Sequence, residues 1–177
     1  MAPFKGYIQV YTGDGKGKTT ASLGLALRAA GNGMKIYIAQ FMKNFDYSEV
    51  KALKKFLSDH VEIQQFGLPE FHTSGDIVTE KERNAALEGI EAVKKAIDSG
   101  NYDIIILDEI NILLYFKIID MKTVLDILDS KPPDMEFILT GRNAPKEIID
   151  RAHLVTEMKE IKHYYTQNVP ARLGIEK

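Results

Sequence analysis

Short apolar segments alternate with longer amphipathic segments along the whole chain. The short segments are rich in β-branched and aromatic residues, which are typical of β-strands. The segment 103–107 is almost continuously apolar, as expected for a central strand buried on both faces of a parallel sheet. In all, we predict strands over residues 7–11, 35–41, 61–66, 103–107, 136–140 and 153–157.

Apolar residues at helical spacing predict helices between these strands. The longest helix begins at Thr79, whose spacing to Glu82 matches a capping box, and Gly100 ends it. The tail after Met158 has no strong period, and residues 67–78 predict a loop because they are rich in turn residues. The expected helices cover residues 19–30, the lysine-rich segment around 50–57, residues 79–100, residues 121–128, and a short stretch from Pro145.

This alternation predicts an α/β fold: a mainly parallel sheet of about six strands with helices on both faces. The chain has 177 residues, of which 45% are hydrophobic and 27% charged. That composition is ordinary for a globular protein, and the length fits one domain. We therefore expect a single domain over residues 1–177.

Charge and cysteine content exclude several classes of function. Lys and Arg number 23 against 25 Asp and Glu, so the net charge is −2, which argues against a dedicated duplex-DNA binder. The chain has no cysteine, which excludes disulfides and thiolate metal sites. We see neither a signal peptide nor an apolar run near the ~18 residues of a membrane helix. We therefore expect a cytoplasmic protein that binds neither nucleic acid nor membranes.

A glycine-rich segment, T-G-D-G-K-G-K-T-T at residues 12–20, lies between a predicted strand and a predicted helix. In that setting, backbone N–H groups and the helix N-terminus bind phosphate. Gly17, Lys18 and Thr19 fit the end of the pattern G-x-x-x-x-G-K-[ST], in which the lysine contacts phosphate oxygens and the hydroxyl reaches a magnesium ion. Thr12 stands where the pattern has its first glycine. The fold prediction thus narrows to a P-loop NTPase-like three-layer sandwich.

Each position of this phosphate loop is a candidate ligand of the nucleotide. A flexible turn with lysines by chance is the alternative, but the three glycines, two lysines and strand–loop–helix context favour phosphate binding. Asp14 and Lys16 are either ligand contacts or solvated loop residues. The predicted nucleotide-binding residues are Thr12, Gly13, Asp14, Gly15, Lys16, Gly17, Lys18, Thr19 and Thr20.

Two acidic residues, Asp108 and Glu109, follow the apolar strand at 103–107. Nucleotide-binding folds place a carboxylate near the metal at such a strand end. Either residue could ligate magnesium directly or through water. The alternative is an acidic turn after a buried strand, but the phosphate loop favours the metal site.

Further motifs follow the other predicted strands. They are Q-F-M-K at 40–43, L-D-E-I-N at 107–111, T-G-R-N-A-P at 140–145 and T-E-M-x-x-x-K-H at 156–163. With G-D-G-K-G-K-T-T at 13–20, their order resembles the P-loop type of ATP:corrinoid adenosyltransferases, which act on cob(I)yrinic acid a,c-diamide or cob(I)alamin. The resemblance runs from about Gly6 to the end of the chain. The family's loop also begins one residue late, which accounts for Thr12.

The resemblance implies an alkyl transfer. A reduced Co(I) corrinoid attacks the 5′ carbon of ATP, triphosphate leaves, and a cobalt–carbon bond forms. ATP is expected to lie reversed in the loop relative to ordinary NTPases, so that its 5′ carbon faces the corrinoid. The family implies Mg²⁺ or Mn²⁺, a reduced flavoprotein or flavin as electron donor, and a homodimer.

The resemblance also assigns roles to residues on the ATP side. Lys18, Asp108 and Glu109 are the expected catalytic residues. Thr19 and Glu109 are the expected metal ligands, with Asp108 as a further ligand or a partner of the ligands. Arg142 either contacts the ATP or forms a surface ion pair.

Gln40, Phe71 and Glu157 are the residues expected on the corrinoid side. Many members carry Gly-Phe-Thr-Trp in the loop after the third strand, whose aromatics help free the lower face of the cobalt. Here Phe71 matches the phenylalanine, but the chain has no tryptophan, and His72 or Thr73 falls near that place. Phe71 either displaces the lower cobalt ligand or pins the loop to the core. His72 is either a cobalt ligand or an exposed loop residue.

Two other functions use the same phosphate loop. A small-molecule kinase would need a lid that carries arginines, whereas the five arginines of this chain are scattered. A non-enzymatic nucleotide sensor would bind a partner protein instead of a second substrate. Product analysis separates the three: tripolyphosphate for the transferase, ADP for the kinase, and neither for the sensor.

Overall fold

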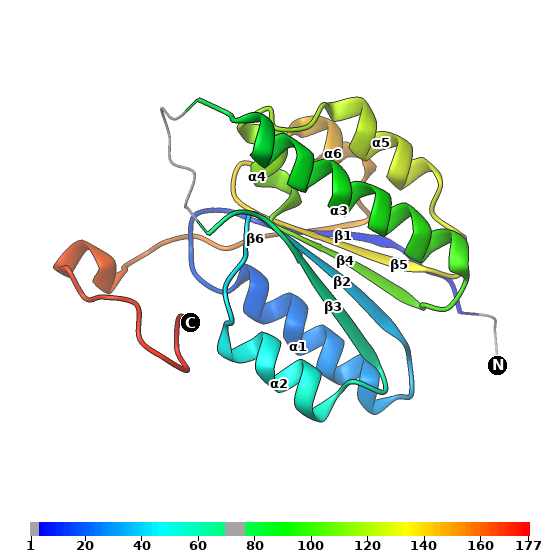
Figure 1. Cartoon of the computed structure of the whole chain (residues 1–177), viewed down its shortest axis with the longest axis horizontal. Coiled ribbons are helices and arrows are strands. Elements are labelled where there is room, and N and C mark those ends of the chain that lie inside the picture. Colours follow the sequence, from blue (N-terminus) through cyan, green and yellow to red (C-terminus); the bar gives the residue numbers. More distant parts are fainter. Residues whose placement is uncertain (1–3, 70–76) are drawn as a thin grey trace.

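The computed structural model describes residues 4–69 and 77–177 and has three layers. A single six-stranded sheet forms the middle layer. Helices α1 and α2 cover one face, and α3, α4, α5 and α6 cover the other (Figure 1). This arrangement confirms the predicted α/β sandwich.

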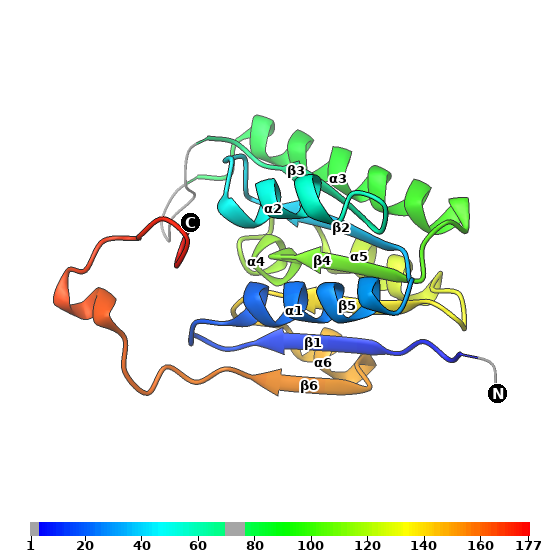
Figure 2. The same ribbon diagram turned by 90° about the horizontal axis from the view of Figure 1, so that it is seen from below.

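The sheet is parallel throughout, with the strand order β3-β2-β4-β5-β1-β6. All the strand arrows point the same way in Figure 2. The carboxyl ends of all six strands therefore meet at one edge of the sheet, where ligands bind in such folds. The strands are β1 (Ile8–Thr12), β2 (Ile36–Phe41), β3 (Val61–Phe66), β4 (Ile104–Asp108), β5 (Glu136–Thr140) and β6 (Leu154–Glu157).

The predicted helices are all present, within one or two residues of their expected ends. The capping box of Thr79 and Glu82 forms, and Gly100 ends α3 in the left-handed conformation. Within the described residues, no helix is both long and apolar enough to cross a membrane. The helices are α1 (Lys18–Gly31), α2 (Ser48–Phe56), α3 (Glu80–Ser99), α4 (Ile110–Tyr115), α5 (Met121–Asp129) and α6 (Lys146–Arg151).

Two short elements were not predicted from the sequence. Helix α4 has six residues, too few to show a period, and it starts directly after Glu109, whose φ is 66°. The second is the 3₁₀ helix η1 (Tyr164–Gln167), which lies in the tail. Both elements follow the carboxyl ends of strands, at the edge of the sheet where ligands bind in such folds (Figure 1).

Two apolar cores lie on opposite faces of the sheet, because side chains alternate along each strand. In β4, Ile105 and Leu107 face the core under α3, α4 and α5, and Ile104 and Ile106 face the core under α1 and α2. All four are at most 3% exposed, as predicted for a central strand. The rigid sheet fixes the position of whatever follows its strands.

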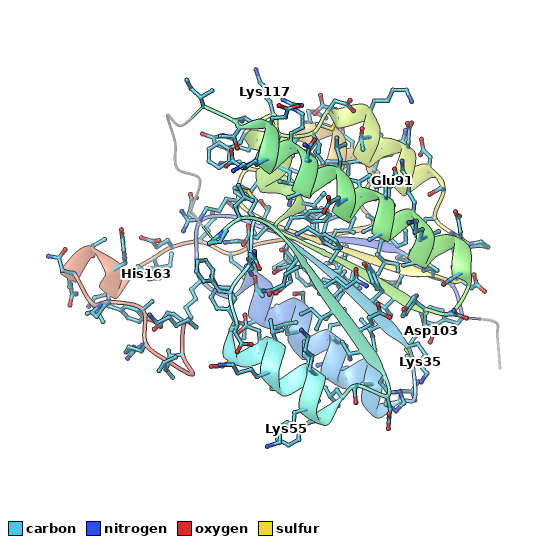
Figure 3. All side chains as sticks on the ribbon, viewed as in Figure 1. Lys35, Lys55, Glu91, Asp103, Lys117 and His163 are labelled. Carbon is cyan, nitrogen blue, oxygen red and sulfur yellow. The ribbon has the colours of Figure 1, made fainter. Side chains whose placement is uncertain are left out.

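The tail after β6 lies at the carboxyl edge of the sheet. His163, on this tail, is at the opposite end of the molecule from Lys35 and Asp103, which join the amino ends of β2 and β4 (Figure 3). The tail then turns back, so that the end of the chain lies near the start of α2 (Figure 1).

Candidate active site

The phosphate loop connects β1 to α1 and takes the shape that its glycines permit. Gly13 and Gly17 have φ values of 91° and 125°, which residues with side chains rarely adopt. Lys18 is 8% exposed, and its ammonium donates hydrogen bonds to the carbonyl oxygens of Gly13 (2.6 Å) and Gly15 (2.8 Å). Burial lowers the pKa of Lys18. The loop is therefore preformed around a buried cation at the N-terminus of α1.

The segment that leaves β6 seals the outer side of the loop. The Met158 N–H donates to the Thr12 carbonyl at 2.8 Å, and the Gly15 N–H donates to the Met158 carbonyl at 2.7 Å. A side chain added at Gly13 would place its Cβ 2.5 Å from the Met158 oxygen. Thr12 itself is buried, and its hydroxyl accepts a hydrogen bond from the Ala144 N–H. Thr12 and Gly13 thus anchor the loop to β6 and to the segment after β5.

Asp108 lies beneath this loop with 1% of its surface exposed. Thr19 and Thr140 hydroxyls donate to its Oδ1 at 2.9 and 2.7 Å. The Gln40 amide and the Lys43 ammonium donate to its Oδ2 at 3.1 and 2.7 Å. Four donors satisfy the carboxylate, as a buried charge requires. The structure thus brings together Thr19 and Asp108, two of the candidate residues named from the sequence.

The two acidic residues have different electrostatic environments. Burial works against ionisation of Asp108, but the charge and hydrogen bond of Lys43, with the two hydroxyls, hold its pKa below the usual value. Burial and the neighbouring charge of Asp108 raise the pKa of Glu109. Glu109 lines the pocket, whereas Asp108 is covered. Glu109 is therefore the acid that a ligand meets first.

Two residues of this centre were given no role by the sequence reasoning. Lys43 follows β2 and Thr140 ends β5, in two motifs that we noted without assigning chemistry to these positions. The Thr140 hydroxyl also accepts a hydrogen bond from the Glu109 N–H at 2.9 Å, so it holds both acids. The signal available was their place at the carboxyl ends of strands beside β4.

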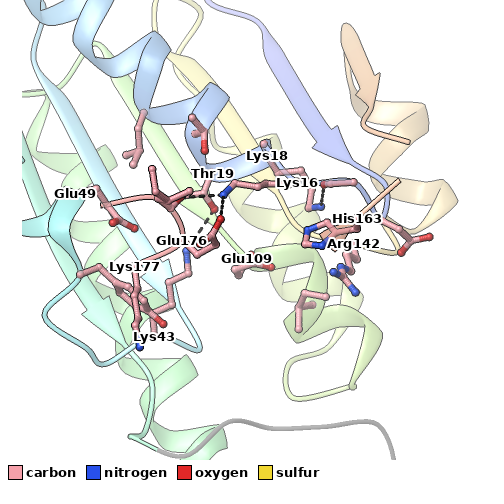
Figure 4. A pocket seen from close by; sticks show the side chains of 18 of the residues that line it. Lys16, Lys18, Thr19, Lys43, Glu49, Glu109, Arg142, His163, Glu176 and Lys177 are labelled. Atoms are coloured by element: carbon pink, nitrogen blue, oxygen red, sulfur yellow. Dashed lines mark hydrogen bonds and ion pairs between the residues drawn. The ribbon is translucent and has the colours of Figure 1, made fainter. Parts of the chain in front are cut away.

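A pocket of about 950 Å³ opens above the loop (Figure 4). Most of the predicted ATP residues line it, including Arg142. Helix α4 adds an apolar wall. Acidic and basic side chains both face this space, which suits a polyphosphate with a cation. The lining residues at issue are Asp14, Gly15, Lys16, Gly17, Lys18, Thr19, Thr20, Lys43, Glu49, Glu109, Ile112, Tyr115, Phe116 and Arg142.

The tail after β6 forms part of the pocket wall. The sequence did not predict this, because the tail shows no hydrophobic periodicity. The Lys16 ammonium pairs with Glu176 at 2.8 Å, and Arg172 also pairs with Glu176. These hydrogen bonds, from Arg172 first and then Lys16 and the Tyr164 hydroxyl, lower the pKa of Glu176. The Ser48 hydroxyl donates to the Lys177 carbonyl at 3.1 Å. The tail therefore brings a carboxylate to a lysine of the phosphate loop (Figure 4).

The residues expected to contact the corrinoid differ in their exposure to solvent. Gln40 is fully buried, where it donates to Asp108 and accepts from the Gln65 amide. A corrinoid contact by Gln40 stays a prediction that its burial does not favour. Glu157 is exposed at the end of β6, beside Gly13. Phe71 lies outside the described residues, as do His72 and Thr73.

No group of three or more His, Cys, Asp or Glu that could hold a metal occurs in the part of the chain that the structure describes. Oxygen donors at the carboxyl end of β4 and the start of α1 include the Thr19 hydroxyl and the carboxylates of Asp108 and Glu109. Nucleotide sites bind Mg²⁺ with one or two carboxylates together with the phosphates of the substrate. This donor set therefore fits a magnesium ion that arrives with a nucleotide.

Comparison of the fold with solved structures finds the flagellar accessory protein FlaH from Methanocaldococcus jannaschii, with a TM-score of 0.59 at 13% identity. The match covers 88% of this chain and 72% of that one. At this identity the likeness shows the fold alone.

Sequence comparison is more specific. A corrinoid adenosyltransferase from Sinorhizobium sp is 35% identical, with 97% of this chain and 80% of that protein covered. One from Escherichia coli K12 is 31% identical, with 97% and 86% covered. An uncharacterized protein from Nostoc sp. is 36% identical, and this chain spans 45% of its length. The family model for the ATP:corrinoid adenosyltransferases BtuR/CobO/CobP matches residues 4–176. The chain therefore belongs to the ATP:corrinoid adenosyltransferase family.

Proposed function

We propose that this protein transfers the 5′-deoxyadenosyl group of ATP to the cobalt of a Co(I) corrinoid. A bond forms between cobalt and the 5′ carbon as the bond from that carbon to the triphosphate oxygen breaks. The two electrons of the new bond come from Co(I), and the electron pair of the broken bond leaves with triphosphate. The protein needs no nucleophile of its own. Its family membership and the preformed phosphate loop with buried Lys18 are the observations that support this reaction.

The leaving triphosphate needs stabilisation, and the loop of residues 13–20 is placed to supply it. The first-turn amides of α1 lack acceptors within the helix and point at the loop. Lys18, Lys16 and Arg142 add positive charge around the same pocket. We propose that these groups bind the triphosphate with the adenosine directed outward, so that the 5′ carbon faces the corrinoid. Alignment and charge stabilisation are then the main catalytic contributions.

We further propose that Thr19 and Glu109 hold a Mg²⁺ or Mn²⁺ ion, with Asp108 orienting Thr19. When bound, the ion would neutralise charge on the triphosphate. Asp108 Oδ1 accepts a hydrogen bond from the Thr19 hydroxyl at 2.9 Å, which orients the lone pairs of that hydroxyl oxygen. Of the two acids that follow β4, Glu109 lines the pocket and Asp108 does not, which supports Glu109 as the direct ligand.

The corrinoid is proposed to approach the open side of the pocket. Glu157 and Phe71, and with less support Gln40, are the proposed contacts. A reduced flavoprotein or flavin would supply the electron that makes Co(I), and the protein would act as a cytoplasmic homodimer. These points rest on the family resemblance.

Product analysis tests the proposed function. The protein is incubated with ATP, Mg²⁺ and chemically reduced cob(I)alamin, and phosphate products are separated by ion exchange. We expect tripolyphosphate in equal amount to adenosylated corrinoid. Release of ADP would indicate a kinase instead, and absence of both products would indicate a nucleotide sensor.

A further inference from the structure

A lysine ammonium lies beside Thr19, a proposed metal ligand, and beside Asp108, the acid proposed to orient Thr19. Lys43 Nζ is 2.7 Å from Asp108 Oδ2 and 3.4 Å from Thr19 Oγ1. Its side chain is 17% exposed and lines the nucleotide pocket, so the ammonium lies between the buried acid and the ligand space. Figure 4 shows Lys43 at the same pocket as Thr19 and Glu109.

The base of this side chain is fixed by the backbone. Met42 has a φ of 55°, and its N–H donates to the Phe66 carbonyl at 2.9 Å. A Cβ added at Gly67 would lie 2.5 Å from the backbone nitrogen of Lys43, so the backbones of Gly67 and Lys43 are in close contact. The start of the Lys43 side chain is therefore held, while its four-carbon stem leaves the ammonium free to change partner.

We propose that Lys43 is a placeholder for the divalent cation: its ammonium neutralises Asp108 before nucleotide binds and leaves Asp108 when the metal and triphosphate arrive. This inference rests on the proposed function, because it concerns the metal of that site. Lys43 is a positioning residue here, since it acts through Asp108 and Thr19.

Charge balance explains why such a residue is needed. Asp108 and Glu109 are adjacent, and Asp108 is buried, so an unneutralised pair would be costly. A divalent cation that binds there must displace the ammonium and overcome its repulsion. Once displaced, Lys43 can turn to Glu49, which lines the same pocket and already interacts with it electrostatically, or to the incoming phosphates. The exchange keeps free metal out until nucleotide brings further negative charge.

Mn²⁺ binding without nucleotide or corrinoid tests this inference separately from catalysis. The free Mn²⁺ signal in electron paramagnetic resonance gives the affinity for wild type, Lys43→Met and Lys43→Gln. We expect both variants to bind Mn²⁺ at least tenfold more tightly than wild type, because no ammonium then neutralises Asp108 or repels the cation. Lys54→Met, on the exposed side of α2, is the matched control and should bind like wild type.

A second change identifies the binding place. Adding Asp108→Asn to Lys43→Met should abolish the gain in Mn²⁺ affinity. Circular dichroism establishes that each variant is folded, and the glutamine variant keeps a polar group beside Asp108 if methionine proves disruptive. Affinity equal to or weaker than wild type in the folded variant would overturn the inference. So would a gain that persists with Asp108→Asn.

Discussion

Replacing Thr140 with valine removes a hydroxyl that contacts both Asp108 and the Glu109 backbone. This hydroxyl donates to Asp108 Oδ1 at 2.7 Å and accepts from the Glu109 N–H at 2.9 Å. Thr140 is fully buried, so water cannot replace either hydrogen bond without local rearrangement. Valine has nearly the same shape, and the change therefore tests the two hydrogen bonds with little change in packing.

The expected loss of stability follows from the kind of each bond. A hydrogen bond to a charged group contributes roughly 1.5–3 kcal/mol, and a neutral one about 1 kcal/mol. Since both partners stay buried, we expect Thr140→Val to lower the free energy of unfolding by about 3 kcal/mol. The Asp108 pKa should also rise, because the Thr140 hydroxyl is one of the groups that lower it.

Urea unfolding followed by circular dichroism measures this effect. Thr156→Val is the control, because Thr156 is an exposed residue of β6 where the same change should be nearly neutral. A loss below about 1 kcal/mol for Thr140→Val, or an equal loss in both variants, would refute the role given to Thr140.

Three further predictions concern the charged groups of the pocket. Lys18→Ala should slow adenosyl transfer by orders of magnitude, measured with saturating cob(I)alamin; near-normal turnover would remove the phosphate loop from the mechanism. Glu109→Gln should raise the free energy of unfolding at pH 7 and not at pH 4. The pKa of Glu109 is raised in the folded protein, so ionising it above pH 4.5 costs folding free energy, and glutamine avoids that cost. Equal effects at both pH values in urea unfolding would contradict this. Glu176→Gln should lower the KM for ATP, because its carboxylate competes with phosphate for Lys16; a higher KM in steady-state assays would indicate that Glu176 supports ATP binding instead.

The sheet could be predicted from the sequence because each strand carries its own local signal. Segments such as 104–107 are apolar throughout, and a segment of this kind between helices has few other structures available. The phosphate loop was predictable for the same reason, since its glycines and Lys18 lie within one short segment that matches a known phosphate-binding pattern. Helix α4 was missed because six residues after the left-handed Glu109 show no period.

The rest of the site depends on contacts between segments far apart in the chain. Lys43 and Asp108 are 65 residues apart, and Lys16 and Glu176 are 160 apart. No local pattern specifies such pairs. The parallel sheet brings Lys43 to Asp108, since Gln40 at the end of β2 is in register with Asp108. The tail after β6 contains η1 and reaches the phosphate loop through the ion pairs of Glu176 with Lys16 and Arg172.

The orientation of ATP in the loop is the central claim about how this site works, and a crystal structure with ATP and Mn²⁺ tests it most directly. Without Co(I) corrinoid, ATP should not be consumed. We predict triphosphate within residues 13–20, anomalous Mn²⁺ scattering beside Thr19 and Glu109, and the 5′ carbon directed toward the open side of the pocket. A terminal phosphate directed to that open side, with the adenosine held at the loop's far end as in a phosphoryl-transfer enzyme, would contradict the account.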